Sequence, residues 1–137
     1  MRHRIPALVM LALLLVTGCG DDGPAGTGVG DQVVFGEGEP PPAFPADFPI
    51  PTNAVIGTTL VDRLNHRSEM ALQIDGLLDA AVQNFTIGLV SQGYVITSSE
   101  GTAESWTIAF ERGELRGEVV FQAVGGFTQA VASVNGT

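Results

Sequence analysis

Lysine is missing from this sequence, and other residues that commonly supply catalytic or binding chemistry are scarce. The 137 residues include one cysteine, one tryptophan, one tyrosine and two histidines, and the six basic residues are all arginines. Fifteen acidic residues give a net charge of −9. A chain this acidic repels phosphate backbones and anionic headgroups, so nucleic-acid binding is not expected. A lone cysteine also excludes an internal disulfide.

The first residues have the layout of an export signal. Arg2 and Arg4 precede an apolar run over residues 7–16, and a glycine-rich stretch follows it. A permanent membrane span needs about 20 apolar residues, so this run is too short to predict one. The alternative is a buried helix of a folded core, but two arginines at its start and the lack of a cap at its end argue against it. The sequence therefore predicts export.

The only cysteine directly follows this run, in the order aliphatic, small, small, cysteine. Val16, Thr17, Gly18 and Cys19 resemble the lipobox of bacterial lipoproteins. The resemblance implies that residues 1–18 are a signal peptide that is removed, and that Cys19 becomes a lipidated N-terminus held in the membrane. A two-chain lipid would also anchor the protein stably, which a single acyl chain does only marginally.

The residue after the cysteine bears on the location. Lipoproteins that stay in the inner membrane of Gram-negative bacteria are similar in having aspartate at this position. This chain has Gly20 there, and Asp21 comes one place later. The resemblance therefore implies the outer membrane if the host is Gram-negative, and otherwise the outer face of the plasma membrane.

Residues 19–50 are expected to form a flexible tether, glycine-rich to about residue 38 and proline-rich from Pro40. Such a composition cannot bury enough apolar surface to offset the entropy of the chain. About twenty residues of glycine-rich coil span on the order of 25 Å, which would hold a domain away from the lipid. A peptide-recognition role for the stretch EPPPAFP is the alternative to a spacer. Without the signal, four arginines face fifteen acidic residues, and the net charge becomes −11.

Residues 51–137 predict one small α+β domain. Residues 54–61 and 69–75 are read as two strands, and apolar and polar residues alternate in the second of them. Residues 76–93 change to the period of a helix. Three further strands follow as a meander, with a short run at 94–97 as a candidate fourth. We expect a curved antiparallel sheet of five to six strands packed on a single helix, in the approximate order ββαββββ.

One helix is about 10 Å wide and covers only two or three strands of such a sheet. Either the sheet curls around the helix, or Phe44 and Phe48 of the tether fold back over an edge. The segment ADFPIPTNAV, followed by a helix ending in LVSQGYVI and a strand meander, also resembles a domain of small uncharacterised lipoproteins of high-GC bacteria. That resemblance implies no activity.

Gly125 and Gly126 predict a two-residue hairpin loop, which fixes the register of the last two strands. The loop pairs Val124 with Phe127 and Val120 with Val131. These four residues then lie on the face opposite the helix, where they form a candidate interaction patch. The same register places Phe121 opposite Ala130 and Val119 opposite Ala132, on the face that the helix covers.

The mature chain contains few residues of the types that commonly act in catalysis. His66 is its only histidine and lies in a predicted turn, while the lone cysteine is assigned to the lipid and lysine is absent. One histidine without neighbouring carboxylates predicts no metal site, and no motif predicts a cofactor. We therefore expect no enzymatic activity. Trp106, the sole tryptophan, is interpreted as a core residue in preference to a ligand platform.

Two functions from different classes remain. The first is a non-enzymatic envelope module that binds a partner, which the sequence does not identify, through the outer face of the sheet. The second is a small-ligand-binding protein or hydrolase that uses a cavity between the sheet and the helix. The sequence does not indicate the oligomeric state.

Overall fold

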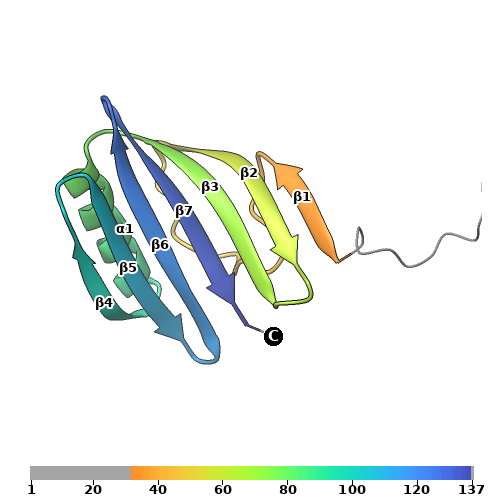
Figure 1. Ribbon diagram of the computed structural model, residues 1–137. Coiled ribbons are helices and arrows are strands. Elements are labelled where there is room, and N and C mark those ends of the chain that lie inside the picture. The colour runs from red at the N-terminus through yellow and green to blue at the C-terminus, as the bar shows by residue number, and fades with distance from the viewer. Residues whose placement is uncertain (1–31, 137) are drawn as a thin grey trace, which may run out of the picture.

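The computed structural model describes residues 32–136, which form one sheet and one helix (Figure 1). The signal, Cys19 and Thr137 lie outside the described residues. No helix within residues 32–136 is long and apolar enough to cross a membrane. The elements in chain order are β1 (Val33–Glu37), β2 (Ala54–Asp62), β3 (Arg67–Asp75), α1 (Leu78–Ser91), β4 (Val95–Gly101), β5 (Ser105–Arg112), β6 (Leu115–Val124) and β7 (Phe127–Asn135).

The α+β class, with one helix and an antiparallel sheet, is confirmed, but the sheet has seven strands instead of five or six. The additional strand is β1, which lies in the expected tether and pairs with β2 from Val33↔Asp62 to Glu37↔Thr58. Its first residues, Val33 to Phe35, are apolar and favour a strand. By pairing with β2, this strand supplies hydrogen-bond partners to an edge that would otherwise be unpaired. The expectation of a tether through residue 50 is therefore wrong for residues 33–50, which are part of the domain.

The strands follow the order β1-β2-β3-β7-β6-β5-β4, so β1 and β4 are the two edges. Tight hairpins join neighbouring strands within β2–β3 and within β4–β7. The central pairing, of β3 with β7, joins residues far apart in the chain, for example Ala71 and Val131. This pairing unites the strands before the helix with those after it.

The predicted register of the last hairpin is confirmed. Gly125 has a φ of 61°, a left-handed conformation that glycine adopts without strain. The paired residues of β6 and β7 include Val124↔Phe127, Gln122↔Gln129, Phe121↔Ala130, Val120↔Val131 and Val119↔Ala132.

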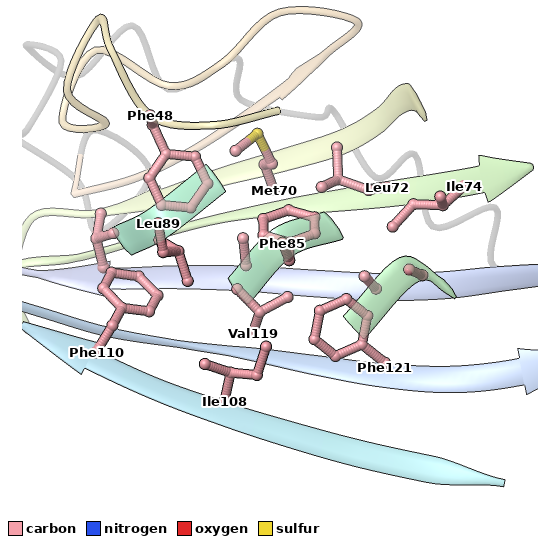
Figure 2. Packing of buried hydrophobic residues seen from close by; sticks show 14 of the residues in the cluster. Phe48, Met70, Leu72, Ile74, Phe85, Leu89, Ile108, Phe110, Val119 and Phe121 are labelled. Atoms are coloured by element: carbon pink, nitrogen blue, oxygen red, sulfur yellow. The ribbon is translucent and has the colours of Figure 1, made fainter. Parts of the chain in front are cut away.

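One face of the sheet, the inner face, carries the core. Helix α1 lies against β4, β5, β6 and β7 and buries Leu78, Ala81, Phe85 and Leu89. Figure 2 shows side chains of the helix and of several strands meeting in one cluster, with Phe85 and Val119 both fully buried. Burying a side chain of this size contributes about 1.5–3 kcal/mol.

The proline-rich segment between β1 and β2 covers the part of the inner face that the helix leaves open. Phe44 and Phe48 are each only 6% exposed, which confirms that they fold back onto the sheet. The ring of Phe48 lies 5.8 Å from that of Phe110 and 6.3 Å from that of Phe85. In Figure 1 this segment passes behind the strands, on the same side as α1. Segment and helix together form one covering layer.

Gly88 lies where this segment crosses the helix. A Cβ atom at Gly88 would lie 2.8 Å from the Cβ atom of Pro49, which is closer than packed carbon atoms tolerate. A glycine costs a helix up to about 1 kcal/mol relative to alanine. Here it permits the close approach of the proline-rich segment.

Arg112 fixes the same segment electrostatically. Its guanidinium donates hydrogen bonds of 2.8 Å to both carboxylate oxygens of Asp47 and another of 2.8 Å to the carbonyl oxygen of Gln92, directly after α1. It also lies 4.2 Å from the ring centroid of Tyr94. The hydrogen bonds from Arg112 hold the pKa of the Asp47 carboxyl below its usual value. One side chain thus joins β5, the end of the helix and the proline-rich segment.

Candidate functional site

The outer face of the sheet, opposite α1, is not covered by any part of residues 32–136. Buried and more accessible side chains alternate along β3, where Ser68, Met70, Leu72 and Ile74 are buried. Two large apolar residues on the outer face are strongly exposed, Phe35 at 75% and Val55 at 69%. Antiparallel sheets commonly expose one polar face to water. Apolar residues on such a face are therefore the ones to consider as a candidate binding surface.

The candidate patch of Val120, Val124, Phe127 and Val131 lies on this face, as its register required. It is divided along the strands, because the pair Gln122↔Gln129 separates Val120↔Val131 from Val124↔Phe127. Val131 is 41% exposed and Val124 is 36% exposed, and the other two are partly buried. The four residues are therefore two apolar pairs and not one continuous surface.

The pair Val120↔Val131 lies nearer the centre of the sheet, and an apolar residue of β3 extends it across the strands. Ala71 of β3 is opposite Val131, so Ala71, Val131 and Val120 form one row across β3, β7 and β6. We name this row the outer stripe. All three side chains are at least partly accessible, so the stripe offers a small apolar surface at the middle of the bare face.

A depression of about 290 Å³ adjoins the outer stripe. The register of β2 against β3 shifts between Ile56 and Thr59, and this bulge places Gly57 beside the depression. Sequence reasoning missed this part of the site, because the pairing of β3 with β7 has no local signal. The residues that line the depression are Val55, Gly57, Ala71, Leu72, Gln73, Gln129, Ala130 and Val131.

Charged residues surround the outer stripe. Arg67 forms an ion pair with Glu69 at 2.6 Å, and Arg116 lies 3.9 Å from a carboxylate oxygen of Glu111. Such exposed pairs contribute little stability. The same strand faces also carry Asp75 and Glu118, opposite Phe127 and Ser133 of β7 respectively, so acidic residues outnumber arginines on this face.

A second concave surface lies on the other side of the sheet, between the start of α1 and the hairpin that joins β4 and β5. This groove has a volume of about 610 Å³, and we name it the helix–hairpin groove. It lies between helix and sheet, where the ligand-binding hypothesis places a cavity. Its lining is mostly apolar and comprises Leu77, Leu78, Asp79, Val82, Gln83, Thr102, Ala103, Trp106 and Ala123.

Trp106 forms part of the wall of this groove. It is partly buried and packs against the core, so its interpretation as a core residue is correct only in part. Its indole Nε1 donates a hydrogen bond of 2.9 Å to the hydroxyl of Ser99, which fixes the ring. Gly101 lies beside the indole, and a Cβ atom there would lie 2.9 Å from Cε3 of Trp106.

Leu77 stands at the N-cap of α1, where residues with a side-chain oxygen are strongly preferred. It makes no side-chain cap hydrogen bond and is 65% exposed. A serine, threonine or aspartate at this position would stabilise the helix by about 1 kcal/mol. Leu77 therefore leaves the helix cap without a side-chain hydrogen bond and adds an exposed apolar side chain to the lining of the groove.

His66 lies in the turn between β2 and β3, as the sequence predicted, with a φ of 50°. The Asp62 carboxylate accepts hydrogen bonds from the backbone N–H groups of Leu64 and Asn65 and so shapes the turn. His66 borders a cleft of about 570 Å³ that also includes Ser68 and Glu114. Residues 32–136 contain no group of three or more histidine, cysteine or acidic residues placed to hold a metal ion.

The chain matches no family model, no curated protein and no solved structure. The function is therefore argued from the geometry of the outer face and of the helix–hairpin groove.

Proposed function

We propose that this chain is a lipid-anchored, non-enzymatic module of the bacterial cell envelope that binds a protein partner through the outer face of its sheet. The anchor is the lipid on Cys19, which follows the lipobox-like residues Val16 to Gly18. The binding role depends on one observation. Helix and proline-rich segment cover the inner face, while the outer face carries the outer stripe and its depression without cover from residues 32–136.

The pattern of the outer face suits a protein–protein contact. Interfaces combine a less charged, apolar centre with a polar rim that remains accessible to water. Here Ala71, Val131 and Val120 form the centre, and Glu69 and Glu118 lie next to it along β3 and β6. The acidic surplus favours a partner whose facing surface is basic, because complementary charge speeds association and suppresses wrong partners.

Crosslinking in the native host tests this proposal. The double variant Val120→Glu with Val131→Glu places two charges in the outer stripe, and the crosslinked adduct of the wild-type protein should disappear. The matched control is Ile87→Glu with Val90→Glu, which makes the same changes at two helix residues that are each 57% exposed. The control should retain the adduct.

The fold of each variant is checked by circular dichroism and by its urea midpoint. An adduct that persists in a folded Val120→Glu, Val131→Glu protein would contradict binding through the outer face. Loss of the adduct in both double variants would point to the helix side as well, and would also contradict the proposal.

The anchor is tested separately in the same host. Metabolic labelling with a fatty acid should label the wild-type protein and leave Cys19→Ala unlabelled. Mass spectrometry should find a mature N-terminus at Cys19 that carries the lipid. A bare thiol at Cys19, or a chain that begins elsewhere, would refute the anchor without bearing on the outer face. Fractionation then separates an outer-membrane from a plasma-membrane location.

A further inference from the structure

The helix–hairpin groove combines an apolar wall with a single charge. Leu78 and Val82 of α1 face Ala123 of β6 and Trp106 of β5 across it. The only charged side chain in the lining is Asp79, whose carboxylate accepts a hydrogen bond from the N–H group of Ala80. A largely apolar pocket with a few polar groups is the usual form of a small-molecule site.

The exposed leucine at the groove is an independent observation. Leu77 occupies a helix cap without making a cap hydrogen bond, and most of its side chain is accessible. Local rules of sequence preference are often broken at functional sites. An apolar ligand that covered Leu77 would supply the reason for its presence.

We propose that the helix–hairpin groove binds a small amphiphile that has one alkyl chain and a positively charged amine head. The alkyl chain would lie against Leu77, Val82 and Trp106, and the amine would lie at Asp79. This site is separate from the outer face, since the two lie on opposite sides of the sheet.

The negative charge of the groove and of the chain favours a positively charged head group. The full negative charge of Asp79 exceeds the partial positive charge of about one half that a helix N-terminus carries. The mature chain has a net charge of −11 if it begins at Cys19, which repels anionic heads at longer range.

The size of the groove is compatible with this ligand. Its volume of about 610 Å³ lies in the usual range for small-ligand sites, roughly 300–1,000 Å³. Asp79 is exposed, so a charged head beside it stays in contact with water. The desolvation cost of the amine is therefore small.

The full-length chain is titrated with decylammonium and with decanoate, which have alkyl chains of similar length and opposite charge, below their micelle concentrations. Trp106 is the only tryptophan, so its fluorescence reports the groove directly, and calorimetry gives the affinity. The cation should bind at least about threefold more tightly than the anion, as expected for one exposed charge. Equal or tighter binding of decanoate, or no binding of either probe, would overturn the proposal.

Two variants separate the parts of the site. Asp79→Asn should lower the affinity for the cation about threefold and leave decanoate binding unchanged or stronger. Ala123→Phe fills the groove from an exposed position and should abolish binding of both probes. The control, Val131→Glu on the outer face, should bind both probes like the wild type.

Each variant is accepted only if its thermal transition remains cooperative. If Ala123→Phe does not fold, Ala103→Trp fills the groove from the hairpin loop and carries the same expectation. Binding that survives groove filling, or that Val131→Glu removes, would place the probe elsewhere and refute the site. Neither result bears on crosslinking through the outer face, which is measured in separate variants.

Discussion

The two faces of the sheet are built from alternate residues of the same strands, yet their surroundings differ completely. Ala132 on the inner face is 0% exposed, whereas Val131, its neighbour on the outer face, is 41% exposed. The inner face is covered by a helix and by a segment that was expected to be a tether. No part of residues 32–136 covers the outer face.

This difference shows how a short chain divides its apolar residues. The inner face concentrates aromatic rings, and Phe85 and Phe121 meet edge to face with ring centroids 5.4 Å apart. Around the outer stripe, the outer face instead has small aliphatic side chains between glutamines and charges. The inner face stabilises the fold through burial, whereas the outer face stays accessible to solvent. Substitutions on the inner face should therefore reduce stability far more than substitutions on the outer face.

The largest contrast is expected between two adjacent residues of β7. Ala132→Glu buries a carboxylate without a partner, which costs several kcal/mol and should prevent cooperative folding of a domain this small. Val131→Glu should change the free energy of unfolding by no more than about 0.5 kcal/mol. Urea denaturation, monitored by circular dichroism, measures the free energy of unfolding of both variants. A well-folded Ala132→Glu protein would show that the inner face is not the core.

The second contrast uses one substitution at two positions. Phe48→Ala removes a buried ring that packs against four other aromatic rings, and should lower the free energy of unfolding by about 3–5 kcal/mol. Phe35→Ala removes a ring that is 75% exposed on edge strand β1, and should cost less than about 1 kcal/mol. Similar losses at the two positions, measured by urea unfolding, would mean that the proline-rich segment is not part of the core.

A smaller contrast concerns two glycines. A Cβ atom at Gly117 would lie 2.4 Å from the backbone oxygen of Ser133 and 2.5 Å from the ring of Phe110, so Gly117→Ala should destabilise the domain by about 1–3 kcal/mol. At Gly57, beside the outer depression, the nearest atom would lie at an ordinary 3.7 Å. Gly57→Ala should therefore change stability by only about 0.5 kcal/mol. Thermal unfolding of both variants measures the difference.

The smallest effect concerns the contact of Arg112 with Asp47. Hydrogen bonds from Arg112 lower the pKa of Asp47 in the folded state. This contact therefore stabilises the fold at pH values above 3.8, the ordinary pKa of an aspartate carboxyl. The stabilisation is lost as the pH falls through the lower, folded-state pKa. Asp47→Asn should therefore be less stable than the wild type at neutral pH, and the two should converge in acid.

Unfolding free energies at several pH values between neutral and about 2 test this sign. Glu111→Gln is the control, since its carboxylate lies 3.9 Å from Arg116 and is not part of the contact. A wild-type advantage that persisted unchanged in acid would show that the carboxylate charge of Asp47 does not stabilise the segment.

Local features of the sequence predicted much of the fold. The helix was visible in the spacing of its apolar residues, and the hairpin register followed from Gly125 and Gly126. The outer position of Val120 and Val131 was a consequence of that register. The missed elements depend on non-local pairing, because β1 is a short apolar run in a glycine-rich context and β3 meets β7 only after folding.

The same division applies to the candidate sites. Val131 was predicted to lie on the outer face, but its neighbours Ala71 and Val55 were not, since they belong to strands on the other side of the non-local pairing. The helix–hairpin groove was expected only as a general cavity. Its particular residues come from α1, β5, β6 and the hairpin, which no local pattern relates to one another.

By itself, the sequence determined the period of the helix and of β3, the tight turns and the acidic charge, because these depend on residues close together in the chain or on composition alone. The tertiary structure alone decided which strands meet at the centre and what covers the inner face. It also decided which apolar side chains stay accessible. The physical reason is that burial depends on the whole arrangement: Phe48 is core only because the sheet and the helix leave a space that its ring fills.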